Sequence, residues 1–229
     1  MITLYHCMSA RSFRPLWMLE ELGLPYQLAM LPFPPRVLAP SYLDVNPLGT
    51  IPLIVDGTTR MTESAAICQY LCALSAPTPL QLEPGENEFG AYLNYVHFGE
   101  ATLTFPQTLV LRYAHFEPEG RRQPTVADDY AKWFLARLRT LEPLLAASSY
   151  LCADRFTAAD VSVGYALMLA QRLGLASRFT PAVATYWERL QQRPAYLRAL
   201  QSQEAAAIAQ GVPRIHAPDT LPDHPARKA

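Results

Sequence analysis

The sequence has no excess of charge of either sign. Its 229 residues include 19 lysines and arginines against 20 aspartates and glutamates, for a net charge of -1 and a pI of about 6.5. A nucleic-acid-binding surface needs basic residues clustered on one face. The balance of charge therefore argues against nucleic acid as a partner.

Long apolar runs are also missing from the sequence. No stretch approaches the roughly 20 consecutive apolar residues that a membrane-spanning helix needs. The opening MITLYHCMSARS lacks the basic and apolar segments of a secretory signal. Half of the residues are nevertheless hydrophobic, which is enough for a sizeable core. We therefore expect a soluble cytoplasmic protein with no membrane partner.

Cysteine is scarce, and its spacing suits neither a zinc site nor a redox motif. The four cysteines are Cys7, Cys68, Cys72 and Cys152, and no two of them form CxxC. No histidine or acidic residue completes the ligand spacing of a zinc finger. We expect buried thiols in a reducing compartment and no bound metal.

Residues 46–64, NPLGTIPLIVDGTTRMTES, carry the most informative pattern in the chain. Pro52 interrupts an apolar run, and a proline has no N–H for a central strand, so a strand is predicted to begin at the proline. Asp56-Gly57 predicts a hairpin. Glu63-Ser64 opens a helix, whose free N–H groups attract a carboxylate. The order of these elements suggests a site for a peptide-like, acidic ligand.

The first 76 residues are predicted to combine strands and helices. Short β-prone runs at 2–6 and 26–31 flank a helical pattern that starts at about residue 12 and ends at Gly23. A strand–helix–strand order favours a parallel strand pair. After a proline-rich irregular segment come the hairpin and a helix over 63–75. This order matches a thioredoxin-like arrangement with a sheet of about four strands.

The rest of the chain is predicted to contain helices only. Pro106 should kink or split the first of them, and Thr157 with Asp160 forms a capping box at the start of a later one. The predicted helices span 86–115, 126–148, 157–174, 181–192 and 195–209. The fold class is thus α/β plus all-α, with domains at 1–76 and 86–209, a linker at 77–85, and a tail at 210–229 that is mobile or draped over the surface.

Four motifs together resemble the cytosolic glutathione S-transferases over about residues 1–205. They are SARSFRPLWMLEELGLPY after the first strand, NPLGTIPLIVDG, the TES helix opening, and FTAADVSVGYAL in the helical half. In the order and spacing of these motifs, the chain resembles the serine-using bacterial members of the theta, zeta or nu type. The resemblance implies an N-terminal thioredoxin-like domain that binds glutathione, a C-terminal all-helical domain, and a homodimer.

The resemblance also implies a set of glutathione contacts. The Ile51-Pro52 bond is expected to be cis, so that the backbone of Ile51 pairs with the cysteinyl part of glutathione. Ser64 would hold the γ-glutamyl carboxylate, and Glu63 would face the ammonium group. Many relatives have a basic residue in place of Thr50, so the glycyl carboxylate is expected to be held more weakly here, or by Arg36 or Arg11.

A hydroxyl group is expected to stabilise the thiolate of glutathione, since the thiol itself is a poor nucleophile. Ser9, in the loop after the first strand, matches the serine-using members. Ser12 is an alternative that could instead cap the first helix. Tyr5 lies near the place of the phenol in tyrosine-using members, and Cys7 falls two residues too early for a cysteine-using one. These alternatives stay open at the level of sequence.

The implied function is a glutathione S-transferase whose activated thiolate attacks a small hydrophobic electrophile. Glutathione-dependent isomerisation, dehalogenation or peroxide reduction would use the same thiolate. A non-catalytic binding or regulatory protein on the same fold is a further alternative. Glutathione would be the co-substrate in each enzymatic case, and the second substrate would meet the sulfur between the two domains.

Overall fold

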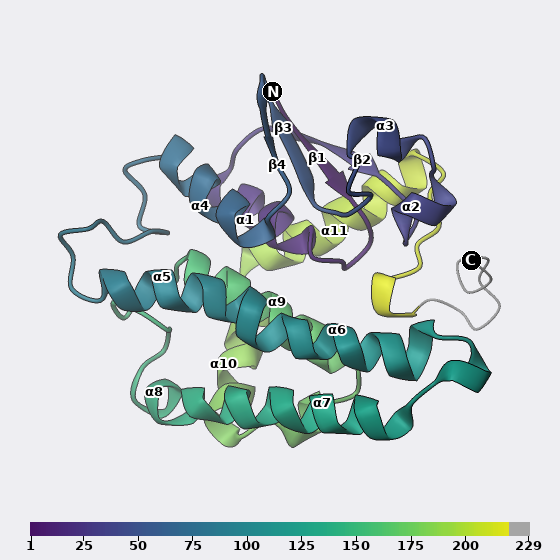
Figure 1. Cartoon of the computed structure of the whole chain (residues 1–229). Coiled ribbons are helices and arrows are strands. Elements are labelled where there is room, and N and C mark those ends of the chain that lie inside the picture. The colour runs from purple at the N-terminus through teal and green to yellow at the C-terminus, as the bar shows by residue number, and fades with distance from the viewer. Residues whose placement is uncertain (220–229) are drawn as a thin grey trace. The chain divides into compact units, whose positions relative to one another are not determined.

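The computed structural model describes residues 1–219, which pack into two units (Figure 1). Unit 1 combines Met1–Leu71 with the described residues from Pro194 onward, and unit 2 consists of Cys72–Arg193. Unit 1 contains the sheet, and the regular structure of unit 2 is helical. None of the helices among residues 1–219 is long and apolar enough to cross a membrane.

The sheet of unit 1 has four strands in the order β2-β1-β3-β4, which confirms the predicted thioredoxin-like arrangement. Strand β1 pairs in parallel with β2, from Ile2 opposite Tyr26 to His6 opposite Met30. It pairs antiparallel with β3, which forms the predicted hairpin with β4 around Gly57. The elements up to residue 74 are β1 (Ile2–His6), α1 (Phe13–Leu22), β2 (Tyr26–Met30), α2 (Pro35–Leu38), α3 (Tyr42–Val45), β3 (Leu53–Asp56), β4 (Thr59–Met61) and α4 (Ser64–Leu74).

Strand β1 directs alternate side chains to a buried face. Ile2, Leu4 and His6 are buried, and the residues between them are partly exposed. This period of two is the normal pleat of a strand with one covered face. His6 therefore lies on the core side at the end of the strand, directly before the loop that leads to α1.

Helix α11 (Pro194–Ala209) packs on α1 and β2 within unit 1 (Figure 1). The Tyr196 ring meets those of Phe13 and Trp17 edge-on, with centroids 5.6 and 4.9 Å away. Arg198 pairs with Glu20 of α1 at 2.9 Å. The sequence prediction had grouped residues 195–209 with the helical domain. Periodicity shows that a helix has an apolar face, but it does not identify the partner that covers that face.

The proline-rich segment before residue 46 contains the short helices α2 and α3, where the sequence predicted irregular backbone. Pro35 occupies the first turn of α2, a position at which the missing N–H is not needed. Each helix is a single turn of 4 residues, too short for a periodic pattern to be visible in the sequence.

The first long helical run of unit 2 is split near Pro106, as the sequence predicted. The π-helical residues Phe98–Thr104 come before α6, and Pro106 lies in the first turn of α6. A wider turn accommodates a residue that cannot donate to the helical ladder. The helices of unit 2 are α5 (Phe89–His97), α6 (Phe105–Leu111), α7 (Pro124–Leu138), α8 (Glu142–Ala147), α9 (Ala158–Arg172) and α10 (Pro181–Gln191), with a second π-helical stretch at Arg112–Phe116.

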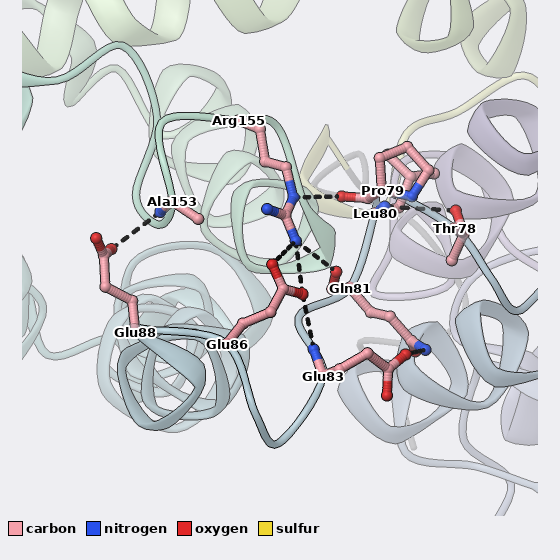
Figure 2. A network of polar contacts seen from close by, with 9 residues as sticks. All are labelled: Thr78, Pro79, Leu80, Gln81, Glu83, Glu86, Glu88, Ala153 and Arg155. Atoms are coloured by element: carbon pink, nitrogen blue, oxygen red, sulfur yellow. Dashed lines mark hydrogen bonds and ion pairs between the residues drawn. The ribbon is translucent and has the colours of Figure 1, made fainter.

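The predicted linker is held against the loop before α9 by Arg155 (Figure 2). The guanidinium donates to the carbonyl oxygens of Pro79 and Gln81, each at 3.1 Å, and to the carboxylate of Glu86 at 2.7 and 2.9 Å. The N–H of Ala158 donates to the carbonyl of Leu80 at 2.8 Å. Much of the segment predicted as a linker is therefore bonded to unit 2.

The capping box predicted at the start of α9 is present and fully buried. Asp160 accepts the N–H of Thr157 at 2.8 Å, and the Thr157 hydroxyl accepts the N–H of Ala159 at 3.3 Å. The same carboxylate also accepts the N–H of Leu151 at 3.1 Å and the hydroxyl of Tyr186 at 2.8 Å. Burial raises the pKa of Asp160 to about 6. One carboxylate thus joins α9, α10 and the loop between α8 and α9.

Replacement of Asp160 by alanine should lower the free energy of unfolding by about 3 kcal/mol, because it leaves several buried donors without an acceptor. Urea unfolding at pH 8, where the carboxyl is ionised, measures the loss. Asp128, an exposed aspartate paired with Lys132 on α7, provides the control, and Asp128→Ala should change stability by about 0.5 kcal/mol or less. Equal losses in the two variants would contradict this account of the cap.

Candidate functional site in unit 1

Ser9 lies in the turn between β1 and α1 and has a strained backbone. Its φ of 53° falls in the left-handed region that residues with a side chain rarely adopt. Such a conformation costs roughly 1–3 kcal/mol and persists only where neighbouring contacts hold it. Strained backbone clusters at functional sites, so the contacts of the Ser9 turn are the place to look for one.

Side chains from the C-terminal part of unit 1 contact Ser9, which is fully buried. The N–H of Ser9 donates to Gln203 Oε1 at 3.0 Å, and Gln203 Nε2 lies 3.4 Å from Ser9 Oγ. His216 Nδ1 lies 2.8 Å from the same oxygen. The Ser9 hydroxyl is thus bonded by side chains that lie about two hundred residues away in the sequence.

The chain after α11 runs across the Ser9 turn. The N–H of Ala217 donates to the carbonyl of Met8 at 2.8 Å, and the Ala217 side chain is buried in a cluster with Cys7, Ala10 and Ile51. Ala217 of the predicted 210–229 tail therefore lies against unit 1. Residues 220–229 of that tail lie outside the described residues.

His6 shares the amide of Gln203 with Ser9. Its Nε2 lies 3.0 Å from Gln203 Oε1, and its side chain is fully buried. Burial lowers the pKa of His6 from 6.5 to about 4, so the imidazole is neutral near pH 7. The amide oxygen therefore accepts a hydrogen bond from the end of β1 and another from the Ser9 turn.

The other hydroxyl candidates are placed differently. Ser12 Oγ accepts the N–H of Cys7 at 3.3 Å and lies 3.5 Å from the Cys7 carbonyl, which closes the turn locally. It does not cap α1 through its side chain. The Tyr5 ring packs against that of Tyr42, with centroids 5.5 Å apart. The Cys7 thiol is buried, and burial raises its pKa far above the ordinary value, so it is a poor nucleophile.

The segment around Thr50 is held by side chains of α3 and the residue that follows it. The carbonyl of Thr50 accepts the Tyr42 hydroxyl and the Asn46 amide, both at 2.8 Å. The peptide bond between Ile51 and Pro52 is cis, as expected from the family resemblance. The Ile51 side chain packs into the same cluster as Ala217, and the Thr50 side chain is exposed.

Ser64 begins α4 and is buried beside a buried arginine. Arg14 Nη1 donates to Ser64 Oγ at 3.2 Å, and both residues are almost fully inaccessible to solvent. Glu63 precedes the helix and is exposed, and Arg11 is half-buried in the Ser9 turn. A buried guanidinium, a hydroxyl and a helix N-terminus together give positive potential at this point.

Comparison with known proteins identifies the family. A model of the glutathione S-transferase N-terminal domain matches residues 8–74. Glutathione S-transferase GstA of Escherichia coli O157:H7 is 31% identical over 172 residues, which cover 71% of this chain and 78% of that protein. The chain belongs to the glutathione S-transferase family. Glutathione S-transferase 3 of Schizosaccharomyces pombe is 28% identical over 99% of both chains.

A solved glutathione transferase has the same fold as this family member. The enzyme from Phanerochaete chrysosporium, in complex with oxidized glutathione, is 27% identical and has a TM-score of 0.77, with 90% of this chain and 97% of that chain covered. The thioredoxin-like unit with its mixed sheet and the helical region are therefore those of glutathione transferases.

Sequence reasoning missed four polar residues around the candidate site of this glutathione transferase. Arg14 interrupts the apolar face of the first helix, and His6 continues the buried alternation of Ile2 and Leu4, so a period count could have identified both as buried. Gln203 gives no comparable signal, because a glutamine in an alanine-rich helix is usually exposed. His216 lies in a segment without any periodic pattern.

The depressed pKa of His6 should make the fold sensitive to acid. The unfolded chain takes up a proton near pH 6.5, whereas the folded chain takes it up only near pH 4. The contribution of His6 to the free energy of unfolding is fully present above pH 6.5. It is lost as the pH falls toward 4, and the loss is about 3 kcal/mol at most. Urea unfolding across this range should show the slope. It should flatten in His6→Asn and persist in His97→Asn, which changes an exposed histidine of unit 2.

Proposed function

We propose that this glutathione transferase activates the thiol of glutathione with the hydroxyl of Ser9, as in the serine-using members of the family. The observation that carries the proposal is the bonding of the three hydroxyl candidates. Ser12 is bonded to the backbone of Cys7, and the Tyr5 ring packs against that of Tyr42 at a tilt. Ser9 Oγ is bonded by side chains, and His216 can exchange with a ligand.

The energetics of a single hydroxyl are adequate for this role. A thiol with a pKa near 8.5 is only a few per cent ionised at neutral pH, and lowering that pKa by about 2 units requires about 2.7 kcal/mol. A hydrogen bond to a charged group contributes about 1.5–3 kcal/mol. Ser9 can therefore supply most of the preference for the thiolate, which then attacks a small hydrophobic electrophile.

The other contacts of glutathione follow from unit 1. The backbone of Ile51 pairs with the cysteinyl residue beside cis-Pro52. Ser64 receives the γ-glutamyl carboxylate with its N–H and hydroxyl, supported by the charge of Arg14, and Glu63 faces the ammonium group.

Thr50 offers no positive charge to the glycyl carboxylate of glutathione, so Arg11 or Arg36 binds that carboxylate. A homodimer and a cytoplasmic location stay predictions from the family resemblance.

Removal of the Ser9 hydroxyl should impair chemistry more than binding. Ser9→Ala should lower kcat about 10- to 100-fold near neutral pH, because the bound thiol returns toward its ordinary pKa, while the Kd for glutathione changes by about threefold or less. Turnover of a panel of electrophiles and calorimetric titration with glutathione measure the two effects. Ser12→Ala is the matched control and should retain the pKa of the bound thiol. Unchanged turnover in Ser9→Ala would exclude Ser9 as the activating group.

His216 Nδ1 lies 2.8 Å from Ser9 Oγ, the atom that we propose binds the sulfur of glutathione. A serine hydroxyl has one proton to donate, so His216 and the sulfur compete for the same hydrogen bond. Loss of the His216 side chain should therefore make glutathione bind more tightly. His216→Ala should lower the Kd for glutathione about threefold, with the fold retained in circular dichroism.

Arg214→Ala provides the control from the same segment. Its guanidinium contacts Glu204 at 3.7 Å on the surface, and its loss should leave the Kd unchanged. Weaker binding in His216→Ala would show that His216 supports the bound ligand instead of competing with it.

A further inference from the structure

Gln203 lies in the middle of α11 with its amide fully buried. A buried amide is unfavourable unless its polar atoms find partners. The partners of Gln203 come from the first residues of the chain: Oε1 meets the N–H of Ser9 and Nε2 of His6, each at 3.0 Å. Helix α11 thus places a polar group at the point where β1 ends and the Ser9 turn begins.

The hydrogen-bond partners determine which way the amide faces. A backbone N–H can only donate, so the atom of Gln203 that meets Ser9 N must be the oxygen. The other end of the amide is then the NH2 group, which can only donate and lies 3.4 Å from Ser9 Oγ. The Ser9 hydroxyl therefore accepts from Gln203 and cannot direct its own proton there.

The contact with His216 shows where the Ser9 proton can go. Nδ1 of His216 lies 2.8 Å from Ser9 Oγ, on a segment that is separate from α11. With the amide acting as a donor, the hydroxyl proton is available to an acceptor in the place of the imidazole. A thiolate that binds Ser9 would need to occupy that place.

We propose that Gln203 is a positioning residue for the transferase reaction: it holds the Ser9 turn through the Ser9 N–H and, by donating to Ser9 Oγ, turns the hydroxyl proton toward the sulfur of glutathione. This inference rests on the proposed role of Ser9. It explains why a non-glycine residue keeps a φ of 53° in this turn, since the amide oxygen takes up the N–H that this conformation presents.

The principal test is Gln203→Met, a change that keeps the length of the side chain and removes its polar atoms. It should lower kcat about tenfold and raise the pKa of the bound glutathione thiol by about one unit. The KM for glutathione should stay within about twofold of the wild-type value. The pKa is read from the ultraviolet absorbance of the thiolate as the pH of the complex is varied.

Gln210→Met is the matched control, at the residue that directly follows α11. Gln210 accepts the N–H of Met30 at 2.9 Å and donates to the carbonyl of Leu28 at 2.8 Å, so its loss also loosens the end of α11 from β2 without touching Ser9. The pKa of the bound thiol should stay at the wild-type value in this control. An equal shift in both variants would overturn the inference and assign the effect to the docking of α11.

A second variant, Gln203→Glu, keeps the inference testable if Gln203→Met does not fold. A carboxylate still accepts from Ser9 N–H and from His6, but it cannot donate to Ser9 Oγ and instead attracts the hydroxyl proton. It should raise the pKa of the bound thiol at least as much as Gln203→Met does. Wild-type kcat and a wild-type thiol pKa in Gln203→Glu would overturn the inference.

A double-mutant cycle separates this inference from the role of Ser9 itself. In a Ser9→Ala background, Gln203→Met should change kcat by less than about twofold, because the group through which it acts is gone. A full tenfold effect in that background would overturn the inference and leave the role of Ser9 intact. Wild-type turnover in Ser9→Ala alone would instead overturn the proposed function, and the inference with it.

Discussion

One buried amide, that of Gln203, connects the three parts of unit 1 that meet at the candidate site. It bonds the last residue of β1 through His6 and the turn before α1 through Ser9, and it does so from α11. The left-handed conformation of Ser9 is unfavourable in isolation, so the turn depends on such outside contacts. Helix α11 is held in turn by the rings of Phe13 and Trp17 around Tyr196. The geometry of the Ser9 hydroxyl is thus a consequence of how the C-terminal helix packs.

The two ends of the candidate glutathione site are built by different means. The region from Thr50 to Ser64 is assembled largely from nearby chain: Tyr42 and Asn46 hold the Thr50 carbonyl, and Ser64 stands at a helix N-terminus. The surroundings of Ser9 come from residues about 200 positions away. Changes in the C-terminal segment can therefore alter the surroundings of Ser9 while the contacts of Thr50 and Ser64 are kept.

Several predictions from the sequence were confirmed because they depend on local physical chemistry. The missing N–H of Pro52 delays the start of a strand, Asp56-Gly57 turns the chain, and Thr157 with Asp160 caps α9, each within a few residues of sequence. The short helices α2 and α3 were missed because a single turn among prolines has no period to detect. The placement of α11 on α1 was missed because an apolar helical face fits many partners.

The sequence by itself determined the fold class, the order of the elements in the sheet unit and the family, since these follow from local patterns in a recognisable order. It also indicated Ser9, Ile51, Pro52 and Ser64 as candidate contacts. Only the tertiary structure decided what surrounds Ser9. A glutamine in an alanine-rich helix and a histidine in an aperiodic tail carry no local signal of contact with a turn at the other end of the chain. The packing of α11 and the path of residues 212–219 bring them there, and such long-range contacts are not encoded in any short stretch of sequence.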